Sequence, residues 1–336
     1  MTNKYILTSV IDKDSKNAGP KAKYDIDFFL ESAGYQKLDL QLPTNRIQKV
    51  KYVLFKLAKV FKTKQAATEI VFQYPIYSMF LTQQIIKAIR KYTKAKLYFI
   101  IHDIETLRGE QGNKRFARDE REVFNQVDGL IVHNQNMQAW LKKQGVTTKM
   151  VNLGLFDYLN EQPLNENNDY RASFCYAGNL QKADFLTKLN LQKIHCTLFG
   201  NNQATSYPAG IHYQGAYHPD ELPRYLTQNF GLIWDGDSLQ TCTGLFGEYT
   251  KYNAPHKTSL YLSTGLPVIV WSQAGVADFV KTHEVGIVVD SLTDLEEQLL
   301  KITPKQYQHL KQNALVIAKQ LRSGYFIKQA LKSLAN

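Results

Sequence analysis

Residues 231–270 read GLIWDGDSLQTCTGLFGEYTKYNAPHKTSLYLSTGLPVIV and decide the fold that we expect for the chain. Two apolar runs, GLIW at 231–234 and PVIVW at 267–271, predict buried parallel strands. Between them, KTSLYLSTGLP predicts a short helix that ends at Gly265 and is stopped by Pro267. The order is therefore strand, long loop, helix and strand, which is typical of a parallel α/β sheet.

The beginning of this short helix is a predicted phosphate-binding position. Ligands of open α/β sheets bind at the carboxyl ends of the strands. The free N–H groups and the dipole at a helix N-terminus favour a phosphate there. Tyr252, Asn253, His256 and Lys257 lie where a nucleotide diphosphate would need them.

The rest of the chain alternates strand-like and helix-like segments, which predicts doubly wound parallel sheets. The other expected strands are Tyr5–Val10, Lys37–Leu40, Glu69–Gln73, Leu97–Ile101, Gly129–Val132, Lys149–Asn152, Ala172–Tyr176, His195–Phe199 and Gly286–Val289. Expected helices include Ala22–Ser32, Thr82–Tyr92, Lys114–Asn125 and Gln306–Leu334. The polar, Asn- and Pro-rich residues 153–169 are the best candidate for a linker.

Length and composition indicate a globular protein of two domains. A chain of 336 residues suits two domains of about 150 residues each. The hydrophobic content of 44% and the mean hydropathy of −0.35 argue against a polytopic membrane protein. No apolar run approaches the roughly 18 residues of a membrane-spanning helix. The N-terminal MTNKYILTSVID has too short an apolar core for a signal peptide, so we expect a cytoplasmic protein.

Cysteine content and net charge restrict the possible functions less than length and hydropathy do. Cys175, Cys196 and Cys242 are scattered, without CxxC spacing, and we expect buried thiols rather than disulfides or a zinc site. The net charge of +11 suits nucleic acid, an anionic membrane surface or phosphorylated small molecules. Charge alone does not choose between these partners.

The block YNAPHKTSLYLSTGLPVIVW (252–271) resembles the C-terminal donor site of a GT-B glycosyltransferase. More narrowly, the chain resembles the bacterial group that contains serine-rich-repeat adhesin glucosyltransferases and β-1,6-galactofuranosyltransferases. The resemblance is specific in residues 15–35, 98–109 and 249–271. It implies two Rossmann-like domains with parallel sheets facing across a cleft. The expected limits are 1–155 for the acceptor domain, 156–170 for a linker, 171–318 for the nucleotide-sugar domain and 319–336 for a terminal helix that crosses back.

The resemblance also implies a donor site built from several loops. Ala18 and Gly19 follow the first strand and would approach the donor, with Gly19 allowing close backbone contact. Lys182 would reach the diphosphate and Tyr217 would flank the nucleotide base. Asp235 would contact the sugar or support the donor loop. The remaining expected donor residues are Tyr252, Asn253, Ala254, Pro255, His256 and Lys257. An ordinary βα turn at 17–20 and a surface role for Tyr217 stay open as alternatives.

Two positions depart from related patterns. Many GT-B families carry a ribose-binding Glu where this chain has Ser259, so backbone groups or Asn253 would recognise the ribose. The narrower group also lacks that Glu. It has Asn where this chain has His256, which leaves the role of His256 open.

The dipeptide His102–Asp103 follows the apolar run LYFII, and HDIETLRG resembles the acceptor-domain loop of the family. An inverting sugar transfer needs a general base beside the acceptor hydroxyl. Asp103 is the first candidate for this base and His102 the second, while Arg108 would orient an acceptor or phosphate. A helix-capping Asp103 is the structural alternative.

Aspartate pairs spaced as DxD occur at Asp12/Asp14, Asp25/Asp27 and Asp235/Asp237. A DxD motif holds Mn²⁺ in GT-A transferases, but three occurrences in one chain make the pattern weak evidence. In GT-B enzymes Lys, Arg and helix dipoles stabilise the leaving diphosphate instead. We therefore expect no metal and no cofactor, with a UDP-sugar as co-substrate. The chain also lacks GxGxxG, Walker A and HExxH motifs.

Residues 46–64, RIQKVKYVLFKLAKVFKTK, contain seven Lys or Arg and no acid. Apolar residues recur at helical spacing at Ile47, Val50, Leu54, Leu57 and Phe61. A sheet-packing helix with a solvated Lys face is one interpretation, and contact with an anionic membrane is the other. No known RNA-binding module accompanies the segment, so we expect no nucleic-acid partner.

The sequence as a whole predicts an inverting, metal-independent hexosyltransferase. It would move galactofuranose or glucose from a UDP-sugar to a glycan, glycopeptide or lipid-linked acceptor, in bacterial surface polysaccharide synthesis or adhesin glycosylation. The resemblance further implies a homo-oligomer. The alternatives are a related transferase with another stereochemical outcome or nucleotide, and a catalytically weak GT-B-like partner that stabilises another transferase.

Overall fold

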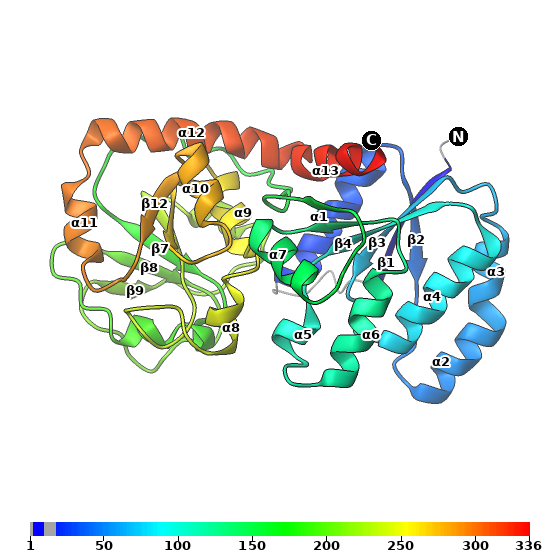
Figure 1. Cartoon of the computed structure of the whole chain (residues 1–336). Helices are drawn as coiled ribbons and strands as arrows, with labels where there is room; N and C mark the ends of the chain where they lie inside the picture. Colours follow the sequence, from blue (N-terminus) through cyan, green and yellow to red (C-terminus); the bar gives the residue numbers. More distant parts are fainter. Residues whose placement is uncertain (1–2, 10–17) are drawn as a thin grey trace. The chain divides into compact units, whose positions relative to one another are not determined.

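The computed structural model describes residues 3–9 and 18–336, and these form two compact units (Figure 1). Unit 1 contains the described residues 3–9, 23–153 and 327–336, and unit 2 contains 18–22 and 154–326. Val10, Asn17 and the first aspartate pair, Asp12/Asp14, lie outside the described residues.

Unit 1 is built on a six-stranded parallel sheet with the order β2-β1-β3-β4-β5-β6. Its strands are β1 (Lys4–Ser9), β2 (Gln36–Leu40), β3 (Glu69–Tyr74), β4 (Lys96–Ile101), β5 (Gly129–Val132) and β6 (Met150–Asn152). The central strands are nearly continuous apolar runs, such as KLYFII in β4, because helices cover both of their faces. The chain order reverses between β1 and β3, and such switch points open a crevice at the carboxyl ends of the strands.

Unit 2 repeats this plan with the strand order β12-β11-β10-β7-β8-β9, again with every pair parallel. Its strands are β7 (Phe174–Ala177), β8 (Cys196–Phe199), β9 (Ile211–Tyr213), β10 (Phe230–Ile233), β11 (Val268–Trp271) and β12 (Gly286–Val289). The switch point of this sheet lies between β7 and β10. The predicted strands are confirmed to within three residues at their ends, and only the three-residue β9 was not predicted.

Helices lie on both faces of the unit 1 sheet, with α4 and α6 on one side and α1 and α13 on the other (Figure 1). The helices of this region are α1 (Ala18–Ser32), α2 (Arg46–Tyr52), the π-helical η1 (Val53–Leu57), α3 (Ala58–Lys62), α4 (Met79–Tyr92), α5 (Glu105–Arg108), α6 (Lys114–Phe124), α7 (Gln135–Lys143) and α13 (Tyr325–Ala335). Helix α1 begins earlier than predicted, so Gly19 and Pro20 lie in its first turn and not in a preceding loop.

Short helices dominate unit 2. They are the 3₁₀ turns η2 (Leu180–Lys182), η3 (Asp184–Thr187) and η4 (Leu222–Tyr225), followed by α8 (Gly244–Tyr249), α9 (His256–Ser263), α10 (Ala277–His283), α11 (Leu295–Lys301) and α12 (Pro304–Arg322). The helix predicted over 306–334 is two helices, because Gly324 adopts φ 71° between α12 and α13. The predicted domain limits stay predictions. Residues 156–170 belong to unit 2, where Phe156, Asp157 and Tyr158 are buried.

Two further sequence predictions concern buried and membrane-spanning segments. Cys175, Cys196 and Cys242 are buried free thiols, as predicted, and burial raises the pKa of Cys242 to about 12. Within the described part of the chain, no helix has both the length and the apolar character needed to cross a bilayer.

His133 makes the stability of unit 1 sensitive to acid. It follows β5, is 2% exposed, and its Nε2 lies 2.8 Å from the carbonyl oxygen of Ile101. Burial lowers its pKa from 6.5 to about 4. Between these two values the unfolded chain binds more protons than the folded one, so the free energy of unfolding falls as the pH drops below 6.5.

We expect His133 to contribute about 2 kcal/mol to the difference in unfolding free energy between pH 7 and pH 5. Urea unfolding at both pH values would measure that difference. His133→Gln should reduce it by this amount even if the variant is less stable at neutral pH. An unchanged difference would contradict the assignment.

Candidate functional site

Helix α9 is fixed against the sheet of unit 2 by one tyrosine and one glycine. A Cβ atom at Gly231 on β10 would lie 2.2 Å from the ring of Tyr261 on α9, so only glycine lets the helix approach this closely. The backbone N–H of Ala177 at the end of β7 donates to the Tyr261 hydroxyl at 2.7 Å. The helix therefore begins at the switch point between β7 and β10.

Further contacts hold the C-terminal end of α9. Nδ2 of Asn160 donates to Oγ of Ser263 at 3.1 Å, and Nε of Arg322 donates to the Ser263 carbonyl at 2.7 Å. Gly265 follows with φ 82° and ends the helix, as the sequence predicts. The second half of the eight-residue helix is thus held by named contacts within unit 2.

An ion pair lies at the carboxyl ends of β7 and β10. Nζ of Lys257 is 2.8 Å from Oδ1 of Asp235, 3.0 Å from the Tyr176 hydroxyl and 3.3 Å from the Trp234 carbonyl. The Tyr176 hydroxyl itself donates to Oδ1 of Asp235 at 2.8 Å. The side chains of Lys257 and Asp235 are only 13% and 14% exposed. These three contacts match the three donors of the ammonium group.

The first turn of α9 has polar groups that other described residues do not satisfy. Its N-cap is Pro255, whose side chain makes no capping hydrogen bond. Among the described residues, the buried atoms Nε2 of His256 and Oγ1 of Thr258 have no hydrogen-bond partner. Burial, with a smaller effect of Lys21, lowers the pKa of His256 to about 3, so its imidazole is neutral. Backbone N–H groups therefore provide the positive end of this helix.

Tyr158 connects His256 to the loop that contains Tyr217. The Tyr158 and His256 rings lie 4.9 Å apart, and the Tyr158 hydroxyl donates to the Pro219 carbonyl at 3.2 Å. Tyr217 itself stacks on Tyr225 at 4.0 Å between ring centroids. The loop is thus brought towards α9, while the Tyr217 ring is already packed against a neighbour.

Lys21 of α1 lies in unit 2 and is 7% exposed. Its Nζ is 3.1 Å from Oδ1 of Asp220 and donates to the Leu159 carbonyl at 2.8 Å. Gly19, two residues earlier, has open space around the position of a Cβ atom. The backbone of Ala18 begins α1, and its side chain is outside the described atoms.

Lys182 lies beside the loop of Asp235 but directs its ammonium group elsewhere. The Gly236 N–H donates to the Lys182 carbonyl at 2.8 Å, whereas Nζ of Lys182 lies 3.5 Å from the centroid of the Phe246 ring. Residues 252–255 lead directly into α9, with Ala254 and Pro255 buried and the N–H groups of Tyr252 and Asn253 donating to the Tyr249 carbonyl. The structure thus brings Asp235 and residues 252–257 together, with the Lys182 backbone adjacent.

In unit 1, His102 follows β4 and belongs to a buried polar network. Its Nε2 is 2.6 Å from Oε1 of Gln73. The amide nitrogen of Gln73 lies within donating distance of Oγ1 of Thr8 and Oδ1 of Asp27, at 2.9 and 2.7 Å. Because Oε1 of Gln73 can only accept, Nε2 of His102 carries its proton.

Asp103 forms an ion pair with Arg108. The sequence predicted a different role for each of these residues, general base for Asp103 and acceptor orientation for Arg108. Glu105 is nearby, and burial together with the Asp103 charge raises its pKa. The alternative prediction, that Asp103 caps a helix, does not fit α5. The N–H groups of Glu105 and Thr106 donate to the carboxylate of Glu120, at 3.1 and 3.2 Å.

Lys23 of α1 approaches the same carboxylates. Its Nζ donates to the Pro75 carbonyl at 2.7 Å, and the side chain is 7% exposed. Burial lowers its pKa to about 8, against the opposing charges of Asp103 and Asp27. Sequence reasoning missed Gln73, Glu120, Tyr158 and Tyr176 as functional neighbours, because each lies far along the chain from the residue it contacts.

The two remaining aspartate pairs are engaged within the protein. Asp25 and Asp27 are at most 1% exposed in α1, and Asp235 pairs with Lys257. The described residues contain no group of three or more His, Cys, Asp or Glu side chains that could hold a metal ion.

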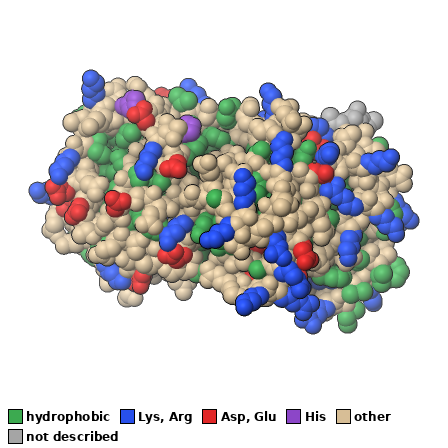
Figure 2. Space-filling view, viewed as in Figure 1, with side chains coloured by type: hydrophobic (Ala, Val, Ile, Leu, Met, Phe, Trp, Pro, Cys, Tyr) green, Lys and Arg blue, Asp and Glu red, His purple; other side chains and the backbone are tan. Residues whose placement is uncertain are grey.

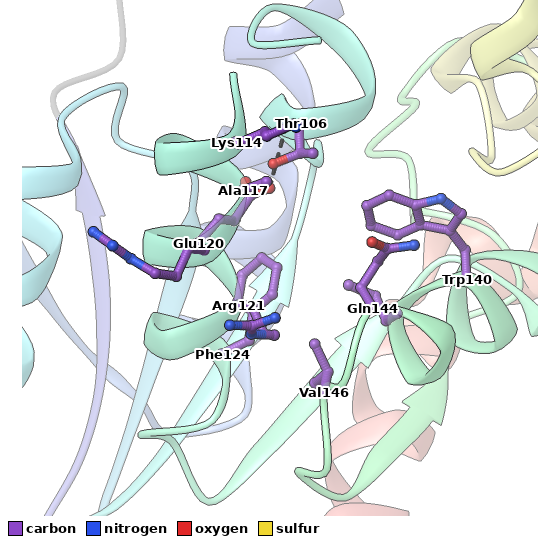
Figure 3. Close-up of a pocket in the computed structure, with 11 residues that line it drawn as sticks. Thr106, Lys114, Ala117, Glu120, Arg121, Phe124, Trp140, Gln144 and Val146 are labelled. Atoms are coloured by element: carbon purple, nitrogen blue, oxygen red, sulfur yellow. Dashed lines mark hydrogen bonds between the residues drawn. The ribbon is translucent and has the colours of Figure 1, made fainter. Parts of the chain in front are cut away.

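Unit 1 also contains a pocket of about 190 Å³ between α6 and α7. Trp140 and Gln144 lie on one side of it, opposite Arg121 and Phe124 (Figure 3). Glu120 also lines it, although that carboxylate already accepts from α5. None of the predicted site residues lines this pocket.

Comparison with protein families identifies the relatives of the chain. The family described as "Glucosyltransferase 3-like, N-terminal domain" matches residues 4–155, and "Glucosyltransferase 3-like, C-terminal domain" matches residues 174–334. The chain belongs to the glucosyltransferase 3-like family. This confirms the resemblance on which the sequence analysis depended.

Two curated relatives of this glucosyltransferase 3-like chain support the same conclusion. Beta-1,6-galactofuranosyltransferase WbbI of Escherichia coli (strain K12) is 32% identical over 79% of this chain and 78% of the relative. Glucosyltransferase 3 of Streptococcus gordonii is 25% identical over 78% of this chain and 77% of the relative. Both names describe sugar transfer, which favours a transferase over the non-catalytic partner.

Solved structures show the fold of this family member. Sucrose-phosphate synthase from Thermosynechococcus elongatus aligns with a TM-score of 0.61 and 12% identity, covering 98% of this chain and 97% of that chain. The trehalose-6-phosphate synthase OtsA aligns with a TM-score of 0.58 and 9% identity, covering 99% of each. The fold is the GT-B fold, as predicted.

The Lys257–Asp235 pair predicts a specific pattern of stabilities. Lys257→Met leaves a buried carboxylate without its cation and should cost about 3 kcal/mol of unfolding free energy. Adding Asp235→Asn should recover most of that loss, because no charge is then buried. Urea unfolding measures both variants. Lys251→Met, which breaks the exposed pair with Glu248, is the control and should cost less than about 1 kcal/mol.

Proposed function

We propose that the protein is a UDP-sugar-dependent hexosyltransferase that acts on a glycan or glycoprotein acceptor. The observation that carries the proposal is the uncapped start of α9 beside Lys257, at the switch point between β7 and β10. Galactofuranose or glucose is the sugar, in keeping with the names of the two relatives. Bacterial surface polysaccharide synthesis or adhesin glycosylation is the corresponding process.

The donor diphosphate binds against the first turn of α9 in this proposal. Support comes from the N–H groups of His256 and Lys257, the first two of the helix, which complement a phosphate, and from the neutral state of His256. Lys257 contributes charge after exchanging its weakest contact, the Trp234 carbonyl at 3.3 Å, for a phosphate oxygen. Asp235 holds the ammonium group in place during this exchange.

The remaining donor residues surround that position. Lys182 would turn from Phe246 towards the leaving diphosphate, and Tyr217 with residues 252–255 would bound the nucleotide. A solved E. coli trehalose-6-phosphate structure was bound with UDP-2-fluoro glucose, which supports this class of donor for the fold (TM-score 0.56, 8% identity, covering 98% of each chain). We propose that the transfer needs no metal or cofactor, because cations and helix dipoles can stabilise the leaving group.

Acceptor activation is assigned to unit 1, with an inverting outcome. Asp103 is the proposed general base, because its partly exposed carboxylate follows β4 at the carboxyl edge of the sheet, where an acceptor hydroxyl can reach it. His102 is the second candidate. Its Nε2 carries the proton and faces Gln73, so Nδ1 is the nitrogen that would act as the base. Arg108 also orients the acceptor. The protein is proposed to act in the cytoplasm as a homo-oligomer.

Nucleotide binding separates this function from its alternatives. In a thermal-shift series with UDP, GDP and ADP, we expect UDP alone to raise the melting temperature, by the equivalent of about 2.7 kcal/mol at a hundredfold excess over Kd. Stabilisation by another nucleotide would indicate a different donor. The absence of any shift, together with no sugar transfer from a UDP-sugar panel, would favour the partner subunit.

The double variant Lys257→Met/Asp235→Asn tests whether Lys257 binds the donor or only neutralises Asp235. We expect it to retain the fold but to bind UDP roughly tenfold to hundredfold more weakly, because a charge-assisted contact is lost. Isothermal titration calorimetry measures the affinity. UDP binding at the wild-type level in the stable double variant would limit Lys257 to a structural role.

Asp103→Asn tests the proposed base. We expect a loss of at least about 100-fold in kcat with UDP affinity unchanged, because the amide cannot accept the proton. Asp119→Asn is the matched control, since Asp119 also pairs with an arginine, Arg118, in the same unit. If both variants transfer sugar at the wild-type rate, His102→Gln becomes the decisive substitution and the Asp103 assignment is wrong.

A further inference from the structure

The basic segment, residues 46–64, forms three consecutive helical pieces, α2, η1 and α3. It contains seven Lys or Arg and no Asp or Glu. Among the residues that the structure describes, none of these seven cations takes part in an ion pair. Lys62 and Lys64 lie over the rings of Tyr92 and Tyr5 instead. The described acidic residues therefore do not neutralise the positive charge of the segment.

The apolar residues of the segment divide into a buried and an exposed group. Leu57 and Phe61, in the second half, are 1% and 0% exposed. The exposed group, in the first half, consists of Ile47, Val50, Leu54 and Phe55, at 68%, 48%, 65% and 72%. Helix α2 contains no buried residue at all. Helix α3 therefore packs against the rest of unit 1, where it contacts α4, whereas α2 does not pack as the sheet-packing interpretation predicts.

The change from exposed to buried apolar residues occurs within the π-helical η1. A π-helical turn contains more residues than an α-helical turn and changes the direction of the side chains that follow it. The helical spacing of Ile47, Leu54 and Leu57 in the sequence therefore does not place them on one packed face. Leu54 and Phe55, both within η1, extend the exposed apolar surface of α2 towards α3.

The surface view shows the two features together. Hydrophobic side chains gather beside Lys and Arg at the lower right of Figure 2, where Figure 1 places α2. Isolated exposed apolar side chains are ordinary, but four large ones within nine residues form a patch. Apolar side chains bordered by cations match the interface of an anionic bilayer, where acyl chains and negative head groups lie a few ångströms apart.

We propose that α2 and η1 bind the protein peripherally to anionic lipid bilayers. Leu54 and Phe55 enter the acyl boundary, while the surrounding lysines contact lipid phosphates. A nucleic acid would use the cations but would leave Ile47, Leu54 and Phe55 exposed to water, and so it fits the segment less well. Bilayer binding by α2 and η1 is independent of the proposed transferase activity and requires no nucleotide.

Flotation of the full chain with vesicles tests this inference. We expect binding to phosphatidylcholine vesicles that contain phosphatidylglycerol and at least about tenfold weaker binding to phosphatidylcholine alone, with the difference reduced by salt. Leu54→Asp/Phe55→Asp should weaken binding to the anionic vesicles by at least about tenfold. Equal binding to both kinds of vesicle, or none to either, would overturn the proposal.

Each segment variant has a control with the same kind of substitution at exposed residues outside the segment. Leu300→Asp/Val316→Asp changes two exposed apolar residues of unit 2 and should bind vesicles like the wild type. Lys51→Glu/Lys56→Glu/Lys59→Glu should weaken vesicle binding roughly a hundredfold, and Lys305→Glu/Lys319→Glu/Lys332→Glu should change it by much less. If a segment variant and its control lost vesicle binding equally, the effect would come from overall charge, and the proposal that α2 and η1 are the binding segment would be wrong.

A single-stranded oligonucleotide distinguishes the nucleic-acid alternative. If the oligonucleotide binds tightly and Leu54→Asp/Phe55→Asp leaves vesicle binding unchanged, the segment is an electrostatic polyanion site and the bilayer proposal fails. Unfolding midpoints close to the wild-type value in every variant would show that the surface was changed and not the fold. Sugar transfer to a soluble acceptor should remain at the wild-type rate in the segment variants, which separates this inference from the proposed activity.

Discussion

The close packing of α9 on β10 is the constraint on which the candidate donor site depends. Gly231 lets the Tyr261 ring lie on the strand, and the Tyr261 hydroxyl accepts from the end of β7. This packing places the uncapped first turn of α9 at the switch point of the sheet, and it places Lys257 against Asp235. A buried ion pair is costly unless it is well bonded, and here Tyr176 and the Trp234 carbonyl complete the bonding. The protein thus maintains a cation beside the first N–H groups of α9.

Unit 1 uses a comparable arrangement with different chemistry. Its switch point, between β1 and β3, is filled by the polar network of Thr8, Asp27, Gln73 and His102. Next to it, Asp103 and Arg108 remain partly exposed as a pair. Both sheets therefore combine an apolar interior with polar side chains at the carboxyl ends of their central strands. In unit 2 these side chains suit an anion, and in unit 1 they suit proton transfer.

The sequence predicted the strands well because buried parallel strands are continuous apolar runs, which few other structures produce. It missed β9, where IHY is too short to give a pattern. It also predicted that Asp235 and Lys257 would share a site, but not that they bond to each other or that Tyr176 joins them. Such contacts join residues up to 81 positions apart, and local periodicity contains no information about them. The exposure of Ile47, Val50 and Leu54 was unpredictable for a similar reason, since helical spacing looks the same whether or not another element covers the face.

The central claim is that the first turn of α9 receives the donor diphosphate. The most direct measurement is a titration of ¹⁵N-labelled protein with UDP, followed through the backbone amide signals. The account predicts that the amides of His256, Lys257 and Thr258 shift most, together with those of the neighbouring β7 and β10 loops. Saturable UDP binding that leaves these three amides unmoved, while signals around Trp140 or elsewhere shift, would contradict it.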